Sequence, residues 1–275
     1  MKVAVLGLGI IGSRAASRLA DDPAIRLTTW NRSPKPETPG FQADLTAAAA
    51  EADVISLYLQ DAYAVREVAT ALPAGPKIVL NHSTIDLATT RWLGHLAQTR
   101  GWRILDAPFT GSREAAAGGQ LVYYAAGAAD LVNEVGTFLL KTGRKIIPCG
   151  DFGNATIIKL VTNLVSACTV QALCEGMATA MKNGIPADAF REAIADNACS
   201  SPLAAMKLPT MAAGDFATHF SLANMFKDSR YVLELAAGLD TPAISAVSQR
   251  MAELCSLGLA NLDYSALFAP YLDHD

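Results

Sequence analysis

The chain has few of the features that mark secreted, metal-binding or nucleic-acid-binding proteins. Its five cysteines, among 275 residues, include no CxxC pair and no cluster with metal-ligand spacing. An odd number of scattered thiols favours a reducing compartment, so we expect a cytoplasmic protein with no bound metal. The formal net charge is −4 and no Lys/Arg cluster occurs, which argues against a nucleic-acid partner.

A targeting segment and a clean membrane span are lacking as well. The sequence enters a strand-like run at Lys2, so we expect no leader before the fold. The most membrane-like stretch, residues 160–181, carries Asn163, Gln171 and Glu175. A buried interface helix is therefore a better interpretation than a membrane span, and we expect no membrane partner. The length suits one large domain or two ordinary ones.

The first twenty residues read as a strand, a glycine turn and a helix. Residues 2–6 form the continuous apolar run of a parallel strand that is covered on both faces. A GxGxxG motif follows, formed by Gly7, Leu8, Gly9, Ile10, Ile11 and Gly12. Such glycines allow a tight turn, approach of a pyrophosphate to the backbone and close helix–strand packing. This context predicts a dinucleotide-binding domain, with a purely structural glycine turn as the alternative.

The residues after the second predicted strand, 25–30, indicate the coenzyme. Proteins that bind NAD usually have Asp or Glu here, whereas this chain has Asn31, Arg32 and Ser33. A guanidinium pairs bidentately with the 2′-phosphate that a carboxylate would repel. We therefore expect NADP(H) to be preferred over NAD(H); an Arg32 that is simply exposed would also fit the sequence.

Three more apolar strands are predicted, at residues 52–59, 77–81 and 102–106. Ligands of such sheets bind at the carboxyl ends of the strands, which makes the residues there cofactor candidates by position: Leu59, Gln60, Ser83 and Thr84. His82 also lies at a strand end, but a single histidine there is more often structural than catalytic. Further strands at 121–126 and 145–148, with a helix between them, complete the predicted sheet.

The strand at 102–106 leads to Thr110, Gly111 and Ser112. Two hydroxyls flanking a glycine can present backbone and side-chain donors to a carboxylate, although an ordinary polar turn has the same composition. Later in the chain, Lys159 and Asn163 lie at i and i+4 on one stripe of a long predicted helix. A lysine and an amide one turn apart, beside a glycine turn, suit a substrate site; a solvated polar stripe is the alternative.

Beyond the glycine turn the pattern is helical only. A helix runs to about residue 183, and others are expected at 187–197, 203–213, 222–237, 243–258 and 263–270. We therefore expect an α/β fold with two domains. Residues 1–152 would form a Rossmann-type, doubly wound, mostly parallel sheet, and residues 153–275 an all-α domain joined to it by the long helix.

Taken together, these motifs resemble those of the β-hydroxyacid dehydrogenase family, which includes 3-hydroxyisobutyrate dehydrogenases and glyoxylate/succinic semialdehyde reductases. The segment 106–112, DAPFTGS, with GQL at 119–121, is similar to the family's substrate loop, and 153–163 is similar to its catalytic helix. NRS at 31–33 resembles the NR(S/T) of NADPH-using semialdehyde reductases. Thr110 stands where the family usually has Ser, and Ala155 and Thr162 replace a usual Gly and Asn.

The resemblance implies a role for each matching residue. Lys159 would be the catalytic acid/base and Asn163 a substrate ligand, while Thr110, Gly111 and Ser112 would hold the substrate carboxylate and Lys227 would lie near the cofactor. The implied reaction is hydride transfer between nicotinamide and a small β-hydroxyacid, semialdehyde or 2-oxo acid, of the 3-hydroxyisobutyrate, tartronate semialdehyde, glyoxylate or succinic semialdehyde type. The long apolar helix suggests a homodimer or homotetramer.

Three alternatives remain at this stage. Imine reductases share the architecture but usually have Asp or Tyr at the position of Lys159. 6-Phosphogluconate dehydrogenase shares the first domain but needs a far larger helical one. A non-catalytic NADP(H)-binding regulatory protein would need the glycine motif, yet it would have no use for Lys159, Asn163 and the 110–112 turn together.

Overall fold

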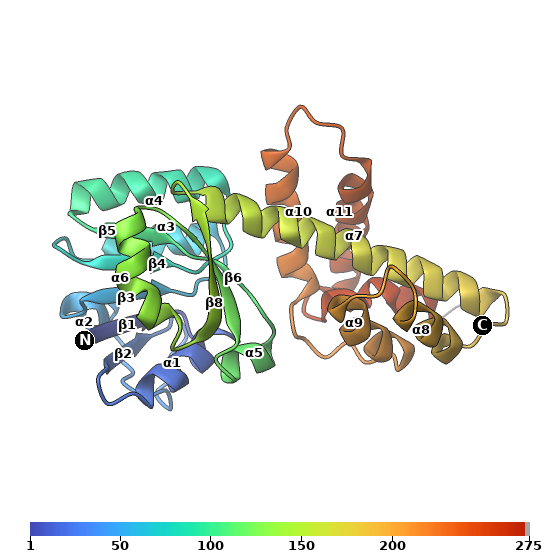
Figure 1. Cartoon of the computed structure of the whole chain (residues 1–275), viewed down its shortest axis with the longest axis horizontal. Helices are drawn as coiled ribbons and strands as arrows, with labels where there is room; N and C mark the ends of the chain where they lie inside the picture. The colour runs from blue at the N-terminus through green and yellow to red at the C-terminus, as the bar shows by residue number, and fades with distance from the viewer. Residues whose placement is uncertain (273–275) are drawn as a thin grey trace. The chain divides into compact units, whose positions relative to one another are not determined.

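The computed structural model describes residues 1–272 and divides the chain into two compact units, Met1–Lys159 and Leu160–Asp275. Helix α7 (Asn154–Lys182) begins in the first unit and continues into the second. Figure 1 shows the sheet of the first unit and the helices of the second. Each unit has a hydrophobic core of its own.

The first unit is built on an eight-stranded sheet. Its strands are β1 (Lys2–Leu6), β2 (Arg26–Trp30), β3 (Val54–Leu57), β4 (Ile78–Asn81), β5 (Arg103–Asp106), β6 (Phe109–Thr110), β7 (Leu121–Ala126) and β8 (Gly143–Gly150). The order is β2-β1-β3-β4-β5-β7-β6, with β8 also paired to β7. The first five strands in this order are parallel to one another, and β7 runs antiparallel to β5 and β6. The predicted Rossmann-type, mostly parallel sheet is confirmed.

Helices cover both faces of this sheet (Figure 1). Val3 and Val5 pack with α1 (Gly12–Ala20), α5 (Arg113–Ala117) and α6 (Ala129–Leu139) on one face. Ala4 and Leu6 pack with α2 (Leu45–Ala50), α3 (Ala62–Ala71) and α4 (Leu87–Arg100) on the other. Because successive strand residues point to opposite faces, a strand buried on both must be apolar throughout.

The second unit is helical. Its core surrounds α7 and is completed by α8 (Ala187–Ala195), α9 (Pro202–Ala212), α10 (Leu222–Leu235), α11 (Pro242–Leu254), a π-helix (Cys255–Leu259) and a 3₁₀ helix (Tyr264–Tyr271). A buried ion pair links two of these elements: Lys207 Nζ lies 2.6 Å from Asp263 Oδ1. The same carboxylate accepts the backbone N–H groups of His219, Phe220 and Ser265, so Asp263 joins α9, the loop at 219–220 and the start of the 3₁₀ helix.

Helix α7 is the one helix of residues 1–272 that is long and apolar enough to cross a membrane, with 29 residues. Leu160, Ala167 and Met177 are fully buried in the core of the second unit, which identifies α7 as a core helix. Val161 and Val165 of the same helix are 37% and 61% exposed in this single chain.

Candidate active site

The parallel strands of the first unit end on one line across the sheet. The register aligns Leu6 with Trp30 and with Leu57, Leu57 with Asn81, and Asn81 with Asp106. The residues predicted to bind the cofactor in this unit follow directly after these positions, so the topology brings them to one edge. This carboxyl edge is where open α/β sheets bind ligands.

The glycine motif forms a cradle at this edge. A Cβ atom at Gly7 (φ 102°) would lie 2.2 Å from the carbonyl oxygen of Tyr58, and one at Gly12 would lie 2.0 Å from that of Gly7. These two glycines are therefore required by the close packing of the turn. Around Gly9, by contrast, a Cβ would meet nothing within 4 Å. The open backbone at Gly9, at the N-terminal end of α1, fits the pyrophosphate of a dinucleotide.

Asn31 and Arg32 have different structural roles after β2. The Oδ1 of Asn31 accepts the N–H of Leu8 at 2.8 Å, and its Nδ2 donates to the carbonyl of Ser33 at 2.8 Å. Asn31 therefore braces the glycine turn. The Arg32 side chain is 61% exposed and forms an ion pair with Glu67 of α3. A 2′-phosphate at this position would compete with the Glu67 carboxylate for the guanidinium.

Ser83 and His82 fix the ends of the central strands. Ser83 Oγ accepts the N–H of Leu59 at 2.9 Å and donates to the carbonyl of Leu57 at 3.2 Å. His82 is 2% exposed, and its Nδ1 lies 2.8 Å from the carbonyl oxygen of Ala107. Burial lowers the pKa of His82 to about 4, so the ring is neutral near pH 7. Its environment agrees with the structural role expected from the sequence.

The predicted carboxylate-binding residues occupy one turn between β6 and α5. Thr110 is exposed at the end of β6, and Gly111 has a φ of 143° that favours glycine. Ser112 caps α5, because its Oγ accepts the N–H of Ala115 at 3.2 Å. The side chain of Ser112 also forms a hydrogen bond with the carboxylate of Glu114, which is one of the causes that lower the pKa of that carboxyl.

The beginning of α7 is attached to the same edge of the sheet. Asp106, the last residue of β5, accepts the N–H and the hydroxyl of Thr156 in the first turn of α7. Burial raises the pKa of this carboxyl to about 6, although hydrogen bonds from Thr156 and Asn81 oppose the increase. Lys159, which is half-buried, follows Thr156 by three residues.

In the second unit, the predicted site residues Asn163 and Lys227 both contact the carboxylate of Asp228. Asn163, only 8% exposed, donates from Nδ2 to Asp228 Oδ2 at 2.7 Å. The ammonium of Lys227 lies 3.0 Å from the other oxygen of Asp228 and 5.2 Å from the centroid of the Tyr231 ring. Since Asn163 and Asp228 are buried, the alternative of a solvated polar stripe does not describe Asn163.

Sequence reasoning did not assign roles to Asp106 and Asp228, which hold the predicted residues in place. Their partners are 50 and 65 residues away in the chain, so no local spacing connects them. The one feature of the sequence that could have indicated such a role is a charged residue in an apolar segment. Asp106 ends a buried apolar strand, and a carboxylate in such a position needs several donors nearby.

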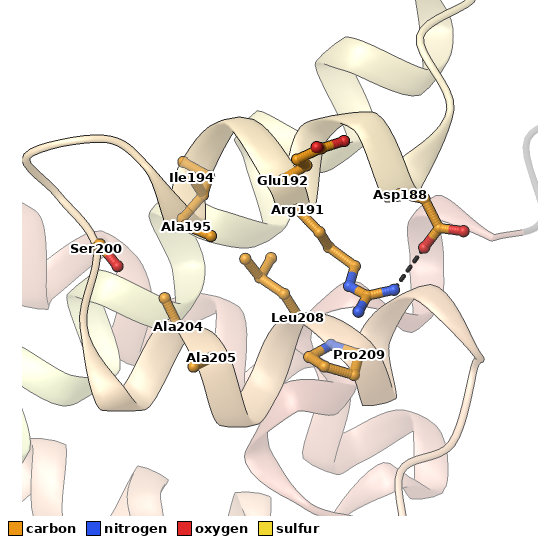
Figure 2. A pocket seen from close by; sticks show the side chains of 10 residues that line it. All are labelled: Asp188, Arg191, Glu192, Ile194, Ala195, Ser200, Ala204, Ala205, Leu208 and Pro209. Atoms are coloured by element: carbon orange, nitrogen blue, oxygen red, sulfur yellow. Dashed lines mark hydrogen bonds and ion pairs between the residues drawn. The ribbon is translucent and has the colours of Figure 1, made fainter.

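A separate cavity of about 480 Å³ lies between α8 and α9. Figure 2 shows Leu208 and Pro209 of α9 on one side of it and Arg191, paired with Asp188, on α8. None of the predicted site residues lines this cavity.

Two family models match the chain, one over its first part and one over its second. The model of the NAD binding domain of 6-phosphogluconate dehydrogenase matches residues 2–150, and the model of the NAD-binding of NADP-dependent 3-hydroxyisobutyrate dehydrogenase matches residues 153–271. The glyoxylate/succinic semialdehyde reductase 2 of Arabidopsis thaliana, a chloroplastic protein, is 27% identical over 97% of this chain and 78% of its own length.

Solved structures share the fold. The 3-hydroxyisobutyrate dehydrogenase of Mycobacterium tuberculosis, solved with L-serine, superposes with a TM-score of 0.87 at 25% identity, covering 98% of both chains. An imine reductase from Pseudomonas sp. superposes with a TM-score of 0.65 at 20% identity, covering 98% of both chains, which shows the fold alone. The family models cover nearly the whole chain, and the chain belongs to the β-hydroxyacid dehydrogenase family of NAD(P)-dependent oxidoreductases.

Proposed function

We propose that the protein is an NADP(H)-dependent reductase or dehydrogenase of small carboxylate-bearing substrates, with Lys159 as its acid/base. The observation that carries the proposal is the attachment of α7 to the carboxyl edge of the sheet through Thr156, one turn before Lys159. This edge also carries the glycine cradle. An amine at such an edge suits proton transfer to an oxygen of a substrate that is bound over the sheet.

The coenzyme, when bound, supplies or accepts the hydride. Lys159 would donate a proton to the developing alkoxide in reduction and take it up in oxidation. Asn163 would orient the substrate's oxygen atoms, and Asp228 supports this role because it fixes the direction of the Asn163 amide. The turn at 110–112 would bind the substrate carboxylate through its backbone N–H groups and the hydroxyl of Thr110.

The coenzyme would be bound by the backbone of the glycine motif at residues 7–12, by Arg32 and by Lys227. We propose NADP(H) over NAD(H) because an exposed guanidinium, with no carboxylate after β2, favours a 2′-phosphate. The substrates that best suit this chemistry are 3-hydroxyisobutyrate, tartronate semialdehyde, glyoxylate and succinic semialdehyde. A reductase named for two of these compounds is among the relatives, and the mycobacterial structure was solved with L-serine, which is itself a 3-hydroxy acid.

The test is NADPH oxidation against these four types of substrate, in the presence of wild-type protein, Lys159→Ala and a control. We expect Lys159→Ala to reduce kcat by about 10²-fold or more, with the dissociation constant of NADPH unchanged. Lys182→Ala is the matched control, because Lys182 lies on the same helix but is exposed at its end. Turnover by Lys159→Ala within a few-fold of wild type would exclude the proposed role.

Two other functions give different results in the same assay. Reduction of a cyclic imine, with no turnover of the four carboxylates, would support imine reductase chemistry on the shared fold. Tight NADPH binding without oxidation by any substrate would support a regulatory protein. Measuring the same panel with NADH tests the coenzyme preference, which a faster reaction with NADH would contradict.

We also propose a cytoplasmic homodimer or homotetramer that binds neither nucleic acid nor membrane. Apolar side chains remain exposed along and after α7, including Val165 at 61% and Ile185 at 49%, and an association of subunits would cover them. Light scattering coupled to size exclusion measures the mass of the assembly. A monomer at micromolar concentration would contradict the proposal.

A further inference from the structure

Helix α7 begins without a cap of its own. Six other helices start after an Asp or Ser whose side chain accepts a backbone N–H of the first turn: α2, α3, α4, α5, α9 and α10. The residue before α7 is Gly153, which has a φ of 96° and no side chain. A positive φ is unfavourable for Ser or Asp, so the turn that leads into α7 excludes the usual local cap.

Asp106 supplies the missing cap from a strand that lies 50 residues earlier in the chain. Its Oδ2 accepts the N–H of Thr156 at 2.8 Å, and both carboxylate oxygens lie 2.9–3.0 Å from the hydroxyl of Thr156. Thr156 is the third residue of α7, so its N–H is one of the four that lack a partner within the helix. The Asp106 side chain is fully buried, which prevents water from replacing it.

Two further contacts hold the same turn. The hydroxyl of Thr156 lies 2.9 Å from that of Thr90 on α4. Ala155, fully buried, packs with Tyr124 and Ala126 of β7. The first turn of α7 is thus attached to β5, α4 and β7 at once, whereas an uncapped first turn is the part of a helix that frays.

We propose that Asp106 is a positioning residue for Lys159: through Thr156 it holds the first turn of α7 and so sets the direction from which the amine reaches the substrate. The inference rests on the proposed function of Lys159. Asp106 itself does not touch the reacting atoms. A change of about 1 Å in the position of a catalytic group can reduce the rate by about 10²-fold, so loss of the cap is expected to affect turnover.

Thr156→Val tests this role, because it removes the hydroxyl but keeps the shape of the side chain and the backbone N–H. We expect kcat to fall by about 10-fold to 100-fold, with KM and the NADPH dissociation constant within about 2-fold of wild type. Thr156→Ser keeps the hydroxyl and is expected to restore kcat to within about 3-fold. A kcat of Thr156→Val within 2-fold of wild type would refute the inference, and so would an equal loss of NADPH affinity, which would indicate a general disturbance of the first unit.

Asp106→Asn is the second variant, used with the same measurements if Thr156→Val does not fold. It keeps one oxygen for the N–H of Thr156 but presents an amide to its hydroxyl, so we expect a decrease in kcat of at least about 5-fold. Lys159→Ala, measured beside these variants, separates the two proposals. If Lys159→Ala is inactive but both cap variants retain wild-type kcat, the positioning role alone is wrong; if Lys159→Ala is active, the proposed function is wrong.

Discussion

Asp106→Asn is expected to make the first unit more stable as the pH rises, relative to wild type. Burial raises the pKa of Asp106 to about 6, against an ordinary value of 3.8. Between these two values the folded protein binds the proton and the unfolded chain does not. The stability contributed by protonated Asp106 is therefore lost as the pH rises from about 4 through 6. A difference of about 2.2 pKa units corresponds to about 3 kcal/mol.

An asparagine at this position cannot ionise, so the variant lacks this loss. The free energy of unfolding of Asp106→Asn minus that of wild type should increase by about 3 kcal/mol over the whole window, and roughly half of the increase falls between pH 5 and 7.5. Any fixed effect of the amide on hydrogen bonding shifts the difference equally at each pH. Cys149 also faces Asp106, but the pKa of its thiol is raised by burial and it stays protonated in this range.

Urea unfolding, followed by tryptophan fluorescence at half-unit steps from pH 5 to 7.5, measures this difference. Trp30, Trp92 and Trp102 all lie in the first unit, so the signal reports on the unit that contains Asp106. Asp130→Asn, which removes an exposed carboxylate from the same unit, is the matched control. A difference that stays constant within the error of the method, or that favours wild type as the pH rises, would show that the hydrogen bonds of Thr156 outweigh the burial of the carboxylate.

Three other variants test separate features. His82→Gln should remove a gain in stability of about 3.4 kcal/mol that wild type acquires as the pH rises from about 4 to 6.5, since the folded pKa of His82 is lowered; the same urea series, extended down to about pH 4, measures it. Glu67→Gln frees Arg32 from an exposed ion pair and should tighten NADPH binding by about 2-fold to 5-fold without changing NADH binding, as titration calorimetry would show. Asp263→Ala leaves the buried ammonium of Lys207 without its partner and should reduce the stability of the second unit by about 3–5 kcal/mol, measured by circular dichroism; a change below 1 kcal/mol would contradict this.

The parts of the fold that the sequence predicted are those with a strong local pattern. The strands at 2–6 and 121–126 have the predicted bounds, because both are continuous apolar runs between turn residues. Helix α4 begins after Asp86, whose side chain accepts the N–H of Thr89, a capping pattern that is local in the sequence. The sequence did not predict α2, α5 or β6, which have six, five and two residues. Elements this short carry too few periodic positions to be recognised.

The predicted site also contains a part that the local sequence determines and a part that it does not. The glycine cradle follows from backbone requirements that the sequence states directly: at Gly7 and Gly12 a side chain would collide with a carbonyl oxygen. The sequence does not predict the pairing of Arg32 with Glu67 or of Asn163 with Asp228, because each pair joins residues more than 30 positions apart. Such contacts depend on which strands and helices are neighbours in the folded chain, and tertiary packing determines those neighbours.

Two buried titratable groups at neighbouring strand ends have opposite effects on stability. His82 follows β4, and its lowered pKa adds about 3.4 kcal/mol as the pH rises from 4 to 6.5. Asp106 ends β5, and its raised pKa removes about 3 kcal/mol as the pH rises from 3.8 to 6. The two windows overlap, so the two contributions oppose each other in wild type. Removal of one group should therefore reveal the pH dependence of the other, and the double variant should lack both contributions.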